Sequence, residues 1–180
     1  MKTIQEIQKE LQKPLSANEI DLRVGQKTKG GKLNLLCYKD ARCDARRLDK
    51  VVGCFGWKRE HDFINGINYC TVSLKNPESG EWVSKQDCGT ESRTEAEKGQ
   101  ASDSFKRACF AWGIGRELYD MPKIEVSEAY EYKLKWVQIQ LAYFTEEYGG
   151  GLAIMILRYG SDELFKFIHP QYAKEKVFIP

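Results

Sequence analysis

The chain has 180 residues, of which 42% are hydrophobic and 12% aromatic, enough for one domain with or without a C-terminal appendage. This composition excludes a globally disordered chain. No apolar run approaches the roughly 20 residues that span a bilayer, and the N-terminal sequence MKTIQEIQKE is too polar for a secretory signal. We therefore expect a cytoplasmic protein that has no membrane partner.

Net charge is only +2, but the charges are unevenly distributed. Residues 1–60 contain 14 basic and 8 acidic side chains, whereas residues 61–180 contain 14 basic and 18 acidic ones. The densest basic part, residues 23–59, has 11 basic and 3 acidic side chains. This distribution indicates either a surface for a polyanionic partner or a solvated basic face.

The N-terminal third predicts two helices and one strand. Ile4, Ile7 and Leu11 recur at helical spacing over residues 3–13, and Pro14 ends that helix. Residues 25–32, GQKTKGGK, have the composition of a flexible basic loop. Residues 33–38 are a short apolar run typical of a strand, and residues 41–52 have the periodicity of an amphipathic helix.

Three strands and a long helix follow. The strands are expected at residues 55–63, 67–75 and 81–89, and the connector NPESG has the composition of a hairpin loop. Thr94 and Glu97 fit a capping box that starts a helix ending near Trp112, where Gly113 stops it. The predicted fold class is α+β, in which an antiparallel three-stranded sheet packs on a long helix (a β-β-β-α core).

The long helix has one apolar stripe and one unusual outer face. At 100° per residue its apolar stripe, which comprises Ala101, Phe105, Ala108 and Trp112, faces the core. Lys106, Arg107 and Phe110 lie on the far side. Lys106 could be merely solvated and Arg107 could pair with Asp103. An exposed Phe110 between two cations, however, is typical of a stacking platform or a subunit contact.

The last third turns acidic after Pro122 and predicts strands at residues 134–145, 152–159 and 164–168. These strands form a small C-terminal β extension. We expect one domain at residues 1–122 and this extension at residues 123–180, which could pack on the same domain.

Candidate motifs for cofactors and catalysis fail on their spacing. GQKTKGGKL has Gly31 where a Walker A loop needs lysine, and it precedes a strand instead of following one. GIGREL lacks the third glycine of a dinucleotide fingerprint. The two histidines are far apart and no CxxC pair exists, so neither a metal nor another cofactor is expected and the cysteines should be reduced thiols. The cysteines are Cys37, Cys43, Cys54, Cys70, Cys88 and Cys109.

Three segments carry a resemblance to a known family. YKDARCDARRLDKVVGCFGW, GEWVSKQDCGTES and EKGQASDSFKRACFAWGIGRELY occur in this order, and the chain resembles the Rad52/Rad22 family of single-strand annealing proteins over residues 14–122. The resemblance is strongest to its phage Sak-like and bacterial DdrA-like branches. It implies a helix, a three-stranded antiparallel sheet and a long helix, the same order that periodicity predicts.

The resemblance also implies a function. Members assemble into rings or helical arrays, hold single-stranded DNA in a basic groove with its bases outward, and let a complementary strand anneal without nucleotide hydrolysis. For this chain it implies a non-enzymatic, homo-oligomeric protein of recombination and double-strand break repair in the cytoplasm of a bacterial host. A phage exonuclease or a single-strand-binding protein would be a fitting partner.

Residue by residue, Lys106 and Arg107 match the family's Lys-Arg pair on the DNA backbone, and Tyr38 matches its groove tyrosine. Arg23 matches an upstream groove arginine, with Lys27, Lys29 and Lys32 added by a longer loop. Phe110 replaces a third basic residue. Ile67 replaces a lysine of a second DNA site, for which Arg93 or Lys98 could substitute. Arg116 could be a groove residue, a subunit contact or a salt-bridge partner at the helix end.

Two other functions stay open at this stage. One is protection of single strands or DNA ends without annealing, as the DdrA-like branch suggests. The other belongs to a different class, a metal-dependent nuclease-like enzyme, whose activity would depend on magnesium.

Overall fold

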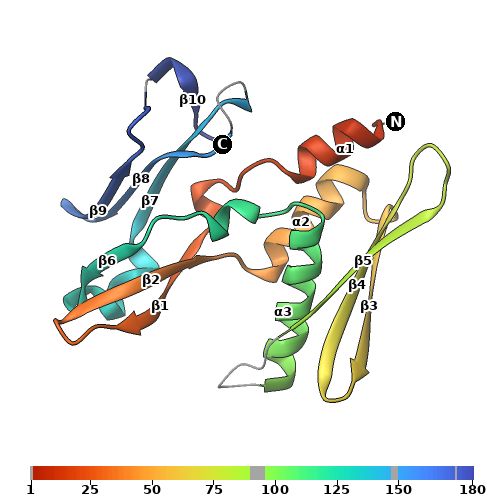
Figure 1. The fold of residues 1–180 in the computed structure, drawn as a ribbon, viewed down its shortest axis with the longest axis horizontal. Coiled ribbons are helices and arrows are strands. Elements are labelled where there is room, and N and C mark those ends of the chain that lie inside the picture. Colours follow the sequence, from red (N-terminus) through yellow and green to blue (C-terminus); the bar gives the residue numbers. More distant parts are fainter. Residues whose placement is uncertain (1, 90–95, 147–149, 173) are drawn as a thin grey trace. The chain divides into compact units, whose positions relative to one another are not determined.

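The computed structural model describes residues 2–89, 96–146, 150–172 and 174–180 (Figure 1). They form two units: residues 1–13 and 41–116 make the first, and residues 14–40 and 117–180 make the second. Mixed helices and antiparallel sheets confirm the predicted α+β class. No helix in these described ranges is both long and apolar enough to cross a membrane.

The first unit contains the predicted β-β-β-α core. Strand β4 pairs antiparallel with β3 on one side and with β5 on the other, and α3 lies against this sheet (Figure 1). The predicted bounds of α2 and β4 are confirmed to the residue, and those of β3 and β5 to within two residues. The elements are α1 (Ile4–Leu11), α2 (Ala41–Val52), β3 (Trp57–Ile64), β4 (Ile67–Lys75), β5 (Trp82–Cys88) and α3 (Ala96–Ala111).

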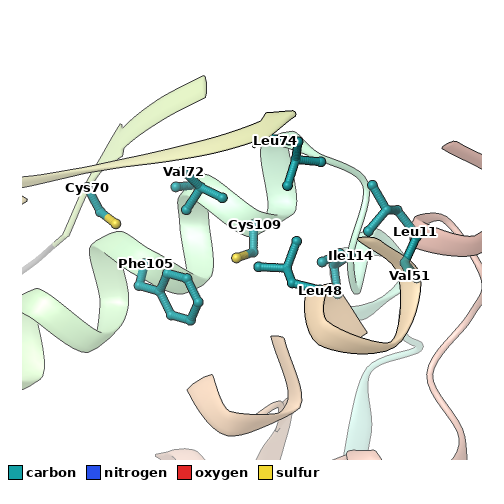
Figure 2. Close-up of a cluster of buried hydrophobic side chains, with 10 residues drawn as sticks. Leu11, Leu48, Val51, Cys70, Val72, Leu74, Phe105, Cys109 and Ile114 are labelled. Atoms are coloured by element: carbon teal, nitrogen blue, oxygen red, sulfur yellow. The ribbon is translucent and has the colours of Figure 1, made fainter. Parts of the chain in front are cut away.

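The core of this unit lies between β4 and the three helices (Figure 2). Alternate residues of β4 face inward, because successive side chains of a strand point to opposite faces. Phe105 of α3 is buried among them, at 1% exposed. The buried cluster is Leu11, Leu48, Val51, Cys70, Val72, Leu74, Phe105, Ala108, Cys109 and Ile114.

Two glycines allow close backbone approach in the first unit. A Cβ on Gly89 would lie 2.1 Å from the carbonyl oxygen of Gln100, and one on Gly56 would lie 2.1 Å from that of Val52. Real Cβ atoms do not come this close to a carbonyl oxygen, so neither position accepts a side chain without a shift of the backbone. Gly89 thus lets the chain after β5 pass directly beside α3.

The second unit is built on two antiparallel sheets with strand orders β1-β2-β6 and β10-β7-β8-β9. Its strands are β1 (Asp21–Lys27), β2 (Lys32–Tyr38), β6 (Ile124–Ser127), β7 (Gln138–Phe144), β8 (Leu152–Tyr159), β9 (Asp162–Ile168) and β10 (Val177–Phe178). The 3₁₀ helices are η1 (Ala17–Glu19), η2 (Arg116–Tyr119), η3 (Glu128–Trp136) and η5 (Lys174–Lys176). The predicted strands at residues 33–38, 152–159 and 164–168 are confirmed.

Two expectations about this part need correction. Residues 25–27 belong to β1 and not to a loop, because Gln26 and Lys27 pair with β2 beyond a bulge at Gly25. Residues 134–136 belong to η3, and the strand expected there begins at Gln138. Strand β6 pairs with β2 and thereby joins residues 14–40 to the C-terminal part of the second unit.

Phe105 should dominate the stability of the first unit. Phe105→Ala removes a ring that is 1% exposed and leaves a cavity between α3 and β4, so we expect the free energy of unfolding to fall by about 3–5 kcal/mol. Phe55→Ala is the matched control, since that ring is 91% exposed, and it should change stability by less than about 0.5 kcal/mol. Urea denaturation measures both; equal effects would contradict this core.

Cys70 should make stability depend on alkaline pH. Burial raises the pKa of the Cys70 thiol from 9.0 to about 11, so the folded state disfavours the thiolate. The stabilisation is complete below pH 9, where the unfolded thiol is protonated, and is lost as pH rises from 9 to 11. Cys70→Ala should therefore lose less stability over this interval than the natural chain. Parallel pH profiles would show that the thiol does not contribute.

Candidate nucleic-acid interface

Helix α3 is oriented by its buried side, which fixes the direction of its charged residues. Phe105 and Ala108 are buried as predicted, whereas Ala101 and Trp112 are only partly buried. Ser104 is also buried, and its hydroxyl donates to Asn68 Oδ1 at 2.9 Å. This packing leaves Lys106 and Arg107 partly exposed on the flanks of the buried stripe.

Lys106 and Arg107 are adjacent, partly exposed and each beside a carboxylate. The side chains are 28% and 41% exposed. Lys106 Nζ lies 4.0 Å from Asp103 Oδ1, one turn earlier in α3. Arg107 Nε donates to Asp87 Oδ1 at 3.2 Å, so the guanidinium is tied to β5. The two cations are thus ordered but still reachable from solvent.

Phe110 and Arg116 interact at the end of α3 and not as the sequence indicated. Phe110 is half-buried and not exposed, and the Arg116 guanidinium lies 5.7 Å from its ring centroid. Arg116 also donates from Nε to the Phe110 carbonyl at 3.1 Å and from Nη2 to the Ala111 carbonyl at 3.0 Å. Arg116 therefore caps the helix end through hydrogen bonds to backbone carbonyls, where the sequence had offered a salt-bridge partner as one alternative. Gly113, at φ 103°, turns the chain there as expected.

Two more cations flank α3, and sequence reasoning missed both. Arg59 of β3 and Lys85 of β5 are both paired with Val72, so all three side chains share the sheet face that packs on α3. The Arg59 guanidinium lies 4.7 Å from the Phe105 centroid. Lys85 Nζ donates to the Ala111 carbonyl at 2.8 Å. The register of β3 and β5 with β4 brings these residues to the helix. In the sequence, only the alternation of side chains along β3 and β5 could have indicated that they face α3.

Arg23 and Tyr38 meet in the second unit. Both lie on the same face of the β1–β2 ladder, and the Arg23 guanidinium lies 6.0 Å from the Tyr38 centroid. Burial raises the pKa of Tyr38, with Asp21 adding to the effect and Arg23 opposing it. Leu36 occupies the space beside the bulge at Gly25, because a Cβ on Gly25 would lie 2.8 Å from Leu36 Cγ. The arrangement presents a cation and an aromatic ring together.

The lysines of the predicted loop lie mostly beside carboxylates. Lys27 Nζ bonds Glu131 Oε2 at 2.7 Å, and this hydrogen bond raises the pKa of Lys27. Lys32 Nζ lies 3.9 Å from Glu125. Two of the three added cations are therefore already partly neutralised.

Of the three residues considered for a second DNA site, the structure describes the side chain of Ile67 alone. Ile67 is 38% exposed next to the Asn65–Gly66 turn between β3 and β4. Arg93 lies outside the described residues. Lys98 is in α3, but its side chain lies outside the described part. In the described ranges, no group of three or more His, Cys, Asp and Glu side chains is arranged to hold a metal ion.

Comparison with known families decides the identity. The model of the Rad52/22 family of double-strand break repair proteins matches residues 3–137, three quarters of the chain. The chain belongs to this family. The matched range includes every candidate residue named above and extends beyond the predicted residues 14–122 at both ends.

Two curated relatives each align with this family member over 123 residues. The single-stranded DNA-binding protein DdrA of Deinococcus radiodurans is 33% identical over 123 residues, and that of Deinococcus deserti is 35% identical over 123 residues. Each alignment covers 67% of this chain but only 58% and 60% of the relatives. The chain thus matches about three fifths of their length. Strands β7 to β10 follow the family match.

The capping role of Arg116 can be tested on the isolated protein. Arg116→Ala removes two hydrogen bonds to the last carbonyls of α3, so the free energy of unfolding should fall by about 1 kcal/mol. Arg158→Ala is the control, because its contacts are longer, at 3.4–3.5 Å. An Arg116→Ala variant of unchanged stability would return Arg116 to the groove or subunit roles.

Proposed function

We propose that this Rad52/22 family member binds single-stranded DNA through its sugar-phosphate backbone and promotes ATP-independent annealing of complementary strands. The observation that carries the proposal is the Lys106–Arg107 pair, which the packing of α3 leaves partly exposed. Both named relatives are single-stranded DNA-binding proteins. The process served is homologous recombination and double-strand break repair.

The electrostatics of the pair suit a phosphate ligand. Partly exposed ion pairs stabilise a protein by only about 0–1 kcal/mol, so a phosphate can compete with Asp103 and Asp87 at little cost. Arginine binds phosphate through its planar fork and lysine as a point charge. Backbone contacts carry no sequence information, which an annealing protein needs because it must accept any strand and leave the base edges free.

Further groups extend the proposed site on the first unit. Arg59 and Lys85 flank the same helix, and Phe110 contributes by supporting Arg116. In the second unit Arg23 and Tyr38, which offer a cation and a ring, are a separate candidate contact for the strand. Lys98 and Arg93 stay candidates by their place in the sequence.

Assembly into a homo-oligomeric ring is part of the proposal. A single protomer offers few phosphate contacts, whereas a ring repeats them at high effective concentration. No nucleotide hydrolysis is required, because pairing of the complementary strands itself supplies the free energy. A phage exonuclease or a single-strand-binding protein is the proposed further partner.

Protection of single strands without annealing is the second candidate, favoured by the names of both relatives, which specify single-strand binding. The two functions differ in one assay. With complementary oligonucleotides labelled as a fluorescence-transfer pair, an annealing protein accelerates pairing, whereas a protecting protein binds each strand and slows it. Acceleration should be the same in EDTA and in magnesium; dependence on magnesium would revive the nuclease-like alternative.

The charge pair should govern the salt dependence of binding. Lys106→Ala and Arg107→Ala should weaken the binding of all single strands alike and flatten the plot of log K against log salt by about 0.7 for each phosphate that is no longer bound. Lys9→Ala removes the same charge from an exposed position on α1 and should leave the slope unchanged. Fluorescence anisotropy at several salt concentrations measures the slopes. Unchanged slopes in both α3 variants would remove these residues from the site.

A further inference from the structure

The 3₁₀ helix η3 sorts its residues by chemistry. Side chains three residues apart align in a 3₁₀ helix, so its nine residues (Glu128–Trp136) form three rows. One row is Glu128, Glu131 and Leu134; the second is Ala129, Tyr132 and Lys135; the third is Tyr130, Lys133 and Trp136. Both acidic residues therefore share one row, and the other two contain only aromatic residues, lysines and an alanine.

The acidic row is engaged by the sheet beside it. Glu131 Oε2 accepts a hydrogen bond from Lys27 Nζ of β1 at 2.7 Å. The helix begins where Glu128 N donates to the Gly31 carbonyl at 3.0 Å. These contacts hold the acidic row of η3 against β1 and the β1–β2 turn.

The aromatic rows form an ordered cluster with lysines on ring faces. Lys133 Nζ lies 5.3 Å from the Tyr130 centroid and 5.1 Å from that of Tyr159 in β8. The two rings meet edge to face at 6.0 Å. Lys135 Nζ lies 4.1 Å from the Trp136 centroid. The Tyr130 hydroxyl also donates a hydrogen bond to Asp162 Oδ2, at 3.0 Å.

Two of these rings remain exposed despite this order. Tyr132 is 87% exposed and Trp136 is 57% exposed, four residues apart on one short helix. Cation–π contacts alone would account for the lysines, but they do not account for two large aromatic residues left in water beside them.

We propose that Tyr132 and Trp136, with Lys133 and Lys135, form a second contact surface for single-stranded DNA, on which unpaired bases stack. Aromatic rings interleaved with cations are the composition of single-strand stacking platforms. The centres of protein–protein interfaces, in contrast, are depleted of lysine. This proposal rests on the proposed function for the identity of the ligand. It differs in the part of the strand that is bound, because η3 would contact bases whereas α3 would contact phosphates.

The test separates stacking from phosphate binding with two ligands, oligo(dT) and an abasic strand of the same length. The natural full chain should prefer oligo(dT). Combined Tyr132→Ala and Trp136→Ala should weaken oligo(dT) binding about tenfold or more and leave abasic binding unchanged, whereas Tyr132→Phe with Trp136→Phe should retain the preference. Tyr119→Ala, at a 69% exposed tyrosine outside the cluster, is the control.

The two proposals fail in distinguishable ways. If the natural chain binds oligo(dT) and the double alanine variant binds it equally well, or loses abasic binding to the same degree, the stacking surface is overturned and the phosphate site stands. Lys106→Ala should lower the affinity for both ligands and keep the preference. If the natural chain binds neither strand, both proposals fall.

Discussion

The packing of Phe105 and Cys109 of α3 against Cys70 and Val72 of β4 is the contact on which the candidate site depends. A helix has only one rotation about its axis that buries this stripe, so the packing also decides which residues face outward. Lys106 and Arg107 stay partly exposed because they flank this buried stripe. The position of the cations is thus a consequence of hydrophobic burial, and their charge does not have to stabilise the fold.

The cations around α3 differ in how firmly their side chains are held. Lys85 and Arg116 bond carbonyl oxygens at the end of the helix, and Arg59 covers a buried ring. These contacts hold the three charges in place, and the hydrogen bonds of Lys85 and Arg116 occupy donors that a ligand would otherwise use. Lys106 and Arg107 are held beside partly exposed carboxylates. A phosphate can replace a carboxylate with little loss, so these two residues suit a reversible, sequence-independent ligand, while the others set the local potential.

The sequence predicted those elements whose pattern is set by a single buried face. The bounds of α2 and β4 agree with the structure because their sequences have a clear 3.6- or 2-residue period, and those of β8 agree because a continuous apolar run marks the strand. Strand β1 was missed because Gly25 and polar residues hide its alternation, and it exists through pairing with β2. The alternation in KLKWVQIQL extends the strand pattern too early, into η3. The Arg107–Asp87, Arg59 and Lys85 contacts depend on strand register, which one sequence does not reveal.

The central claim is that this chain binds single strands through their phosphates and without regard to sequence. The most direct measurement is the salt dependence of affinity of the natural full chain for two mixed-composition oligonucleotides of equal length and unrelated sequence. The account predicts that log K falls linearly with log salt, with the same slope for both strands. Affinity that is insensitive to salt, or slopes that differ with sequence, would contradict it.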